Sequence, residues 1–119
     1  MLITRYLRHS AVGYKALTSN VVPLSSLEFS PHTSTQKTPM LIFHGLFGSK
    51  HNWKTASEKL AKRTQRKVYA FDLRNHGESP SVDGAISSLD AMAGDVMQFV
   101  ERQNLEKVVL LGHRYCNLS

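Results

Sequence analysis

Three short apolar runs, separated by two segments of helical periodicity, constrain the fold of this chain more than any other feature. The runs are MLIFH at residues 40–44, KVYAFD at 67–72 and KVVLL at 107–111. Continuous apolar runs of this length are typical of strands buried on both faces, and helical crossovers between such strands make them parallel. The sequence therefore predicts an α/β fold, with three layers and a mainly parallel sheet in the middle.

The segments between the runs are expected to be the two crossover helices. The first should begin after a cap at Ser49 or Asn52 and end near Thr64. Its expected inward face is Trp53, Ala56, Leu60 and Ala61. The second helix is expected over about residues 88–103. Ahead of the first run, residues 21–29 indicate a short extended segment that Pro23 confines to a sheet edge, and residues 30–39 form a polar linker.

Composition excludes several classes of protein. The chain has 119 residues, 41% of them hydrophobic, which suits one small globular domain and not a wholly disordered chain. No apolar run approaches the roughly 18 residues of a membrane-spanning helix. A single cysteine excludes an internal disulfide, and the histidines have no metal-site spacing, so we expect no metal. The net charge of +6 comes without an aromatic-studded basic stripe, so we expect no nucleic-acid partner.

The first twenty residues have a composition of their own. They contain Arg5, Arg8 and Lys15, many hydroxyl and apolar residues, and no Asp or Glu, with Leu2 and Tyr6 near one side of a helix. This composition is typical of a mitochondrial transit peptide, because a secretory signal needs an unbroken apolar centre. We therefore expect a mitochondrial protein, with the matrix as its compartment. The alternative is an ordinary basic terminus.

The carboxyl ends of the three runs carry the residues suited to chemistry. Ligands of parallel sheets bind at these ends, where HGLFG (44–48), DLRNHGES (72–79) and GHRYC (112–116) should meet. The glycines of HGLFG permit a tight turn with unpaired backbone N–H groups, which can stabilise a negative oxygen. The alternative is a glycine-rich turn with a packed His44. A phosphate loop is excluded because Lys50 lacks the required glycine spacing.

The second of these loops is expected to brace its neighbours. Asp72 can accept hydrogen bonds from loop amides, and Arg74 can bridge neighbouring loops. His76 is not expected to be a catalytic base, because the sequence supplies no nucleophile for it to contact. The four histidines considered as metal ligands and set aside are His44, His51, His76 and His113.

The phrases HGLFGSKHNW and RKVYAFDLRNHGESP, followed by KVVLLGH, resemble the α/β-hydrolase superfamily of the AB hydrolase-1 type. The resemblance is greatest to the mitochondrial alpha/beta hydrolase domain-containing protein eleven group and covers about residues 21–113. It implies the family's third, fourth and fifth strands in the spatial order fourth, third, fifth. It also implies hydrolysis of small or lipid-like carboxylic esters without a cofactor. The amides of Leu46 and Phe47 would form the oxyanion hole. The matching motif-loop positions are His44, Gly45, Gly48, Asp72, Arg74, Asn75, His76, Gly77, Gly112 and His113.

The chain departs from the family pattern after His113. The family carries a G-x-S-x-G nucleophile elbow there, whereas this chain has Arg114 at the serine position and Cys116 at the second glycine. A guanidinium stays protonated and cannot attack a carbonyl, and nothing around Cys116 or the terminal Ser119 indicates an activating base. We therefore expect an inactive fragment of a mitochondrial hydrolase, with residues 40–113 as the amino-terminal part of the domain and 114–119 as a divergent tail.

Two alternatives and one liability follow from this reading. The chain can be a non-catalytic module that uses HGLFG to bind a ligand or a partner protein. It can also be half of an enzyme whose serine, acid and histidine come from a second chain. Because more strands follow the fifth in the family, residues 107–111 are expected to form an exposed apolar edge that promotes aggregation and association with chaperones.

Overall fold

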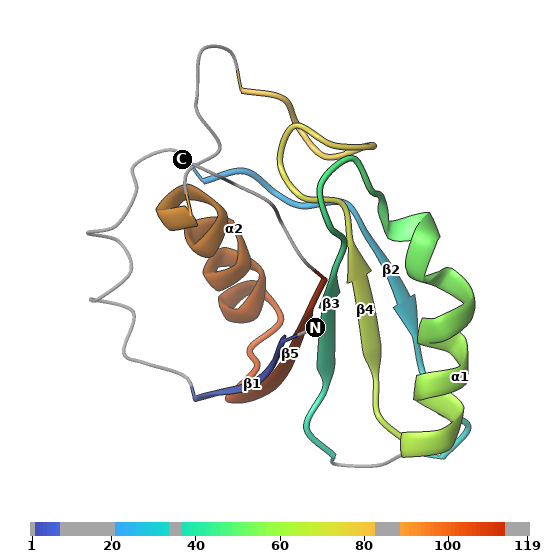
Figure 1. The fold of residues 1–119 in the computed structure, drawn as a ribbon. Coiled ribbons are helices and arrows are strands. Elements are labelled where there is room, and N and C mark those ends of the chain that lie inside the picture. Colours follow the sequence, from blue (N-terminus) through green and yellow to red (C-terminus); the bar gives the residue numbers. More distant parts are fainter. Residues whose placement is uncertain (1, 8–20, 34–36, 83–88, 114–119) are drawn as a thin grey trace.

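The computed structural model describes residues 2–7, 21–33, 37–82 and 89–113, with the side chains of residues 2–7 and Leu89 left aside. Five strands and two α-helices, one of them preceded by a 3₁₀ turn, make up this part of the chain (Figure 1). Their bounds are β1 Leu2–Leu7, β2 Ser26–Phe29, β3 Met40–Phe43, η1 Lys50–Trp53, α1 Lys54–Thr64, β4 Val68–Phe71, α2 Leu89–Arg102 and β5 Lys107–Gly112.

The strands form one sheet in the order β1-β5-β3-β4-β2. Strand β3 is parallel to both β4 and β5, with Ile42 opposite Ala70 on one side and opposite Leu111 on the other. The outer strands are antiparallel: β2 pairs with β4, and β1 pairs with β5. The predicted α/β fold is confirmed, including the spatial order β4-β3-β5 that the family resemblance implies.

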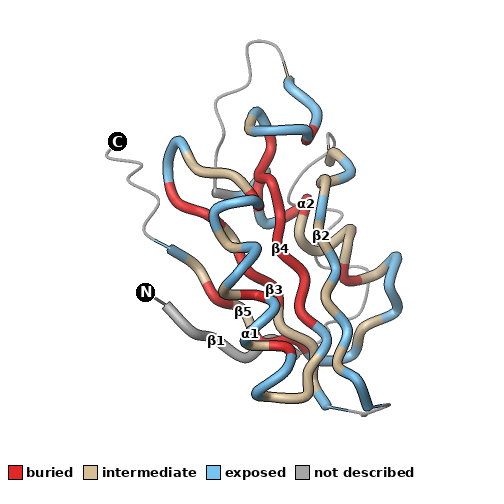
Figure 2. The backbone as a smooth tube through the Cα atoms, turned by 90° about the vertical axis from the view of Figure 1, so that its right-hand side faces the viewer, coloured by how far each residue is buried: buried red, intermediate tan, exposed pale blue. Residues whose placement is uncertain are grey.

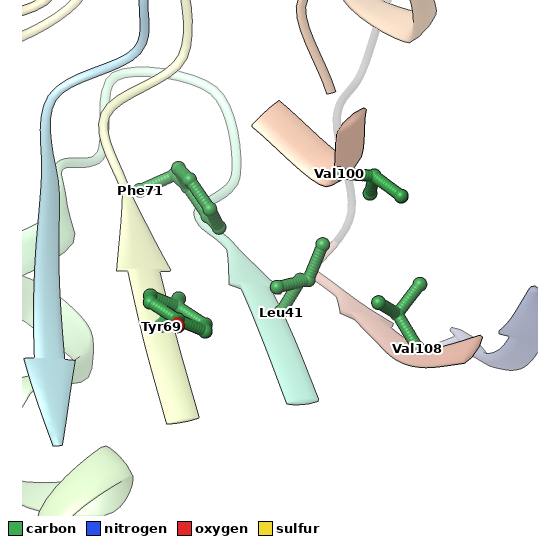
Figure 3. Packing of buried hydrophobic residues seen from close by; sticks show 5 residues of the cluster. All are labelled: Leu41, Tyr69, Phe71, Val100 and Val108. Atoms are coloured by element: carbon green, nitrogen blue, oxygen red, sulfur yellow. The ribbon is translucent and has the colours of Figure 1, made fainter. Parts of the chain in front are cut away.

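Each face of the sheet is covered by one helix, because successive strand residues point to opposite sides. On one face, α2 covers a buried apolar cluster, whose sheet and helix members are shown in Figure 3: Leu41, Tyr69, Phe71, Val100 and Val108. On the other face, α1 covers a second cluster, the α1-side cluster, which consists of Ile42, Ala61, Val68 and Leu111. All four residues of β4 are buried, as the red stretch of its trace shows (Figure 2).

The first helix follows the sequence prediction closely. Ser49 is the cap of the 3₁₀ turn η1, and its N–H donates to the Asn52 Oδ1; α1 begins after this turn, at Lys54. The expected inward residues Trp53 and Leu60 pack against the α1-side cluster. The extended segment expected at residues 21–29 is a strand only over β2, and it lies at a sheet edge as predicted.

Strand β1 differs from the sequence expectations in two respects: it covers the edge of β5, and it is not helical. The predicted open edge at β5 is wrong, because β1 pairs with β5 along its whole length, from Leu2 opposite Gly112 to Leu7 opposite Lys107. Residues 2–7 form a strand and not a helix: Ile3, Thr4 and Tyr6 are compatible with a strand, and the open edge of β5 gives it a pairing partner. Residues 8–20 of the expected transit peptide lie outside the described part. Within the described residues, no helix is both long and apolar enough to cross a bilayer.

Candidate functional site

The HGLFG segment forms a tight turn directly after β3. The Gly48 N–H donates to the Gly45 carbonyl at 3.0 Å, which leaves Leu46 and Phe47 as the two central residues. Phe47 has φ 61°, a left-handed value that is typical of the third position of a type II turn and usually requires glycine. A bulky residue held there carries strain of order 1–3 kcal/mol, and such strain concentrates at binding and catalytic sites.

The two central amides of this turn are available to a ligand. Among the described residues, no acceptor is paired with the N–H of Leu46 or of Phe47. Gly48 keeps the turn closed, because a Cβ at this position would lie 2.9 Å from the Cβ of His44. Two backbone N–H groups on adjacent residues can both donate to one negatively charged oxygen.

The buried side chain of His44 stabilises the turn. Its Nδ1 donates to the Gly45 carbonyl at 2.7 Å, and its Nε2 accepts the Leu73 N–H at 3.0 Å. Because an amide can only donate, Nε2 carries no proton, and the ring is neutral with its proton on Nδ1. Burial also lowers the pKa of His44, which favours this neutral form. The packed histidine that the sequence left as an alternative is therefore present.

Asp72, the residue after β4, braces the loops as predicted. Its Oδ1 accepts the Lys50 N–H at 2.7 Å, and its Oδ2 accepts the Glu78 N–H at 2.9 Å and lies 3.1 Å from the Lys50 Nζ. Burial alone would raise the pKa of the Asp72 carboxyl, but the two amides and the ammonium group outweigh burial and hold this pKa below its ordinary value.

Lys50 is a residue whose role the sequence did not reveal. The side chain is buried, and its Nζ donates to the Ser25 Oγ at 2.6 Å and lies 3.3 Å from a Glu78 oxygen. Burial opposes the charged form, yet the carboxylates of Asp72 and Glu78 outweigh it and raise the pKa of Lys50. All of these contacts are distant in sequence, so no local pattern marks Lys50 as anything other than a surface lysine beside the turn.

The rest of the second motif loop wraps around the Asp72 carboxylate. Gly77 has φ 49°, and a Cβ there would lie 2.4 Å from Asp72 Oδ2, so only glycine fits. Asn75 also has a left-handed φ, 63°, and its Oδ1 accepts the Val82 N–H at 2.7 Å. His76 packs against His44, with their ring centroids 4.9 Å apart.

Arg74, which the sequence predicts to bridge neighbouring loops, contacts α2. It forms a buried, two-pronged ion pair with Asp95, with contacts of 2.7 and 2.8 Å. Asp95 also accepts the Val22 N–H at 2.8 Å. The hydrogen bond to Asp95 raises the pKa of Arg74. This loop is therefore tied to α2 by a contact across 21 positions of sequence.

An open cavity of about 560 Å³ lies against the turn. Its lining is His44, Gly45, Leu46, Phe47, Gly48, Asn52, Trp53, Ala56 and His113. The HGLFG turn and the residue after β5 thus meet as predicted, and the His113 ring stands edge-on to Trp53 with centroids 6.1 Å apart. Asp72, Arg74 and His76 do not line this cavity.

Several predicted site residues do not line the cavity, and others lie outside the residues that the structure describes. Gly112 ends β5, and a Cβ added to it would meet no described residue within 4 Å, so none of these residues requires glycine there. Arg114, Cys116 and Ser119 lie outside the described residues. Across the part of the chain that the structure describes, no three His, Cys, Asp or Glu side chains are grouped as metal ligands.

Comparison with known proteins assigns the fold to a family. Residues 38–113, more than half of the chain, match the alpha/beta hydrolase fold family. The chain belongs to the α/β-hydrolase family. An abhydrolase domain-containing protein of Schizosaccharomyces pombe is 43% identical over 89 residues, which are 73% of this chain and 32% of that protein. The sn-1-specific diacylglycerol lipase ABHD11 of Xenopus laevis is 44% identical over 75 residues, which are 63% of this chain and 23% of that protein.

A solved structure has the same arrangement. The esterase of a marine microorganism superposes with a TM-score of 0.61 at 35% identity, covering 71% of this chain and 30% of that one. The match to each of these α/β-hydrolases therefore spans a third or less of the relative's length. The described residues contain the turn after β3 and the loop after β4 of the hydrolase fold, together with the start of the loop after β5.

Proposed function

We propose that the Gly45–Gly48 turn binds the carbonyl oxygen of a carboxylic ester and stabilises negative charge on it. The observation that carries this proposal is the pair of amides at Leu46 and Phe47, which have no acceptor among the described residues and stand at the rim of the cavity. The strained φ of Phe47 supports it, because such backbone strain persists at sites where backbone N–H groups must point toward a ligand.

The substrate class we propose is a small or lipid-type carboxylic ester. Two of the similar proteins are named as a lipase and an esterase, and both names denote enzymes that act on ester bonds. Their shared requirement is an oxyanion site for the acyl carbonyl, which is the feature that the turn provides. No metal or organic cofactor is needed for this role.

A pair of variants at Leu46 tests the binding role. Proline is favoured at the second position of a type II turn, so Leu46→Pro keeps the turn and deletes the N–H, whereas Leu46→Ala keeps the N–H. Calorimetric titration with butyrate, an anionic stand-in for the oxyanion, should show at least about tenfold weaker binding for Leu46→Pro alone, because a hydrogen bond to a charged group contributes about 1.5–3 kcal/mol. Equal affinity of the two variants would refute the proposal.

We further propose that residues 1–119 do not hydrolyse esters by themselves. The support is the sequence Gly112-His113-Arg114-Tyr115-Cys116, in which arginine stands where the family's elbow has its serine. The purified chain should turn over p-nitrophenyl butyrate no faster than buffer and should not react with a fluorophosphonate probe. Turnover that disappears in Cys116→Ala or in Ser119→Ala would show that one of these residues replaces the missing serine.

The same geometry serves the alternative of a non-catalytic binding module. A turn that binds an acyl carbonyl without a nucleophile retains its ligand, so binding and turnover separate the two functions. Butyrate binding without p-nitrophenyl butyrate hydrolysis is the result that favours a binding module. We also propose that the chain associates with chaperones, because it spans only part of the hydrolase fold of its relatives; recovery of a chaperone with the tagged chain from cells would test that association.

For its location we propose the mitochondrial matrix, on the basis of the acid-free, arginine-containing sequence of residues 1–20. A chain tagged at its carboxyl end should accumulate in mitochondria. Replacement of Arg5, Arg8 and Lys15 by glutamine removes the positive charge and should leave the tagged chain in the cytosol. An unchanged distribution would contradict this proposal.

A further inference from the structure

We propose that the outward face of α1, together with the ring of Phe47 in the Gly45–Gly48 turn, docks onto an anionic phospholipid surface. The observation that carries this proposal is a set of exposed cations on α1 beside an exposed aromatic ring. The proposal goes beyond the binding of an acyl oxygen, because it concerns an outer surface of the chain and the kind of partner that fits it.

The first support is the charge of α1. Within its 11 residues the helix carries a single acidic side chain, Glu58. Its cations, which we call the α1 basic face, are Lys54, Lys59, Lys62 and Arg63. All of them are exposed, and none forms an ion pair with a described residue, whereas Lys50, Lys67 and Arg74 each do. The charge of the α1 basic face is therefore available to an anionic partner.

The second support is the place of these cations on the helix. Lys59 and Arg63 follow Ala56 by three and seven residues, and this spacing puts the three side chains on one stripe of α1. Ala56 lines the cavity together with Phe47, so the stripe runs outward along the helix from the edge of that cavity. Cations and turn thus belong to one continuous surface.

The third support is the exposed apolar surface of the turn. Phe47 is 91% exposed and Leu46 is 39% exposed, and in the described part of the chain these are the large hydrophobic residues that remain exposed. A lipid surface offers phosphate groups to cations and an apolar layer to a neighbouring aromatic ring. A nucleic-acid duplex would leave Leu46 and Phe47 in water, so the pair favours a lipid surface over a duplex.

Co-sedimentation of the full chain with vesicles tests this surface. Vesicles of phosphatidylcholine mixed with phosphatidylglycerol are compared with vesicles of phosphatidylcholine alone, which carry no net charge. The chain should bind the anionic vesicles at least about tenfold more tightly, because each Lys or Arg near an anionic surface contributes to attraction. Added salt should release it, because exposed charges are screened.

A pair of double variants locates the docking surface. Lys59→Gln/Arg63→Gln removes two charges from the α1 basic face and should weaken binding to anionic vesicles about 25-fold, or about fivefold for each cation. Arg102→Gln/Lys107→Gln is the matched control, because it removes the same charge from exposed residues that end α2 and begin β5. The control should lose less than about twofold, since α2 covers the other face of the sheet (Figure 1). Both variants keep the basic residues 1–20, so that segment cannot cause a difference between them.

Phe47→Asn tests the contribution of the ring. Asparagine tolerates the left-handed φ of this position and keeps the backbone N–H, so the turn is retained while the apolar ring is removed. Binding to the anionic vesicles should weaken about tenfold, because the ring no longer leaves water. Affinity equal to that of the wild type would contradict a role for the ring in docking.

Three results would overturn the docking surface. One is an equal loss of affinity in Lys59→Gln/Arg63→Gln and in its control, which would mean that the vesicles respond to net charge alone. Another is equal binding to both kinds of vesicle. The third is salt-sensitive binding to double-stranded RNA without binding to vesicles, which would assign the α1 basic face to nucleic acid. None of these results affects the proposed function, which the butyrate titration measures in the absence of lipid.

Discussion

The Asp72 carboxylate binds both the backbone and the side chain of Lys50. The Lys50 N–H donates to Oδ1 at 2.7 Å, and the Nζ lies 3.1 Å from Oδ2, with 4% of the lysine side chain and 1% of the aspartate side chain exposed. One residue at the end of β4 thus fixes the segment that leaves the Gly45–Gly48 turn. Because His44 holds the other side of this turn, the free amides are anchored at both ends.

Removal of the Lys50 charge should destabilise the fold strongly. Lys50→Met keeps most of the side-chain volume but leaves the buried Asp72 carboxylate without its cation, which costs about 3 kcal/mol or more. Urea denaturation should therefore show a loss of this size in the free energy of unfolding. Lys54→Met is the control, because Lys54 is exposed on the next helical turn and should change stability by less than about 0.5 kcal/mol. A Lys50→Met chain as stable as Lys54→Met would contradict the account.

Two glycines of the motif loops should respond differently to the same substitution. Gly77→Ala places a methyl group against the Asp72 carboxylate at a positive φ, and we expect a loss of about 2 kcal/mol or more in the free energy of unfolding. Gly112→Ala adds a methyl group that meets no described residue within 4 Å, so its stability should lie within about 0.5 kcal/mol of the wild type. Thermal and urea unfolding measure the stability of both variants. Equal losses would show that the contact with Asp72 is not what excludes a side chain at position 77.

His44 should make stability depend on pH near neutrality. Its pKa is lower in the folded chain than the 6.5 of an ordinary histidine, so between the two values the unfolded chain binds more protons. The stability from neutral His44 is complete above pH 6.5 and is lost as the pH falls through the folded pKa. The free energy of unfolding should thus decrease between pH 6.5 and 5 in the wild type.

The matched variants for this pH effect are both histidine-to-glutamine changes. His44→Gln should be less stable at pH 7.5 and should show a flatter dependence between pH 6.5 and 5. His32→Gln, which removes an exposed histidine, controls for the loss of one titratable side chain. The same slope in His44→Gln and in the wild type would mean that His44 is not the group responsible.

The pairing of β1 with β5 should limit self-association. In an antiparallel ladder alternate residues face the partner strand, so one of two consecutive prolines must remove a hydrogen bond to β5. Thr4→Pro/Arg5→Pro should therefore open the apolar edge of β5 and shift the chain toward larger species in size-exclusion chromatography with light scattering. Thr4→Ser/Arg5→Lys keeps both N–H groups and should behave as the wild type. Identical elution of the two double variants would contradict a protective role for β1.

The central part of the fold could be predicted from the sequence because its signals are local. The apolar runs at β3, β4 and β5 and the helical periodicity of α1 need no knowledge of distant residues. The convergence of the HGLFG turn with His113 followed from the rule that the carboxyl ends of parallel strands lie at one edge. The bracing role of Asp72 followed from its place after a strand.

The contacts that could not be predicted are those between residues far apart in the chain. From the sequence, Lys50 is indistinguishable from the solvent-exposed lysines around it. In the structure its side chain is buried by contacts with Ser25 and with Asp72, the residue after β4. Arg74 pairs with Asp95 of α2, 21 positions away, and the sequence does not indicate which acidic residue will be there. The composition of residues 2–7 suits both an import signal and a strand, and only the free edge of β5 decides between helix and strand geometry.

The most direct test of the account is the response of the two turn amides to a ligand. In ¹H–¹⁵N spectra of the labelled chain, titration with butyrate should shift the Leu46 and Phe47 amides along one saturable curve, to lower field as each N–H donates to the carboxylate. The amide of Phe29, on the edge strand β2, should stay unchanged. Leu46 and Phe47 resonances that do not move while butyrate is in excess would contradict the claim that this turn binds an acyl oxygen.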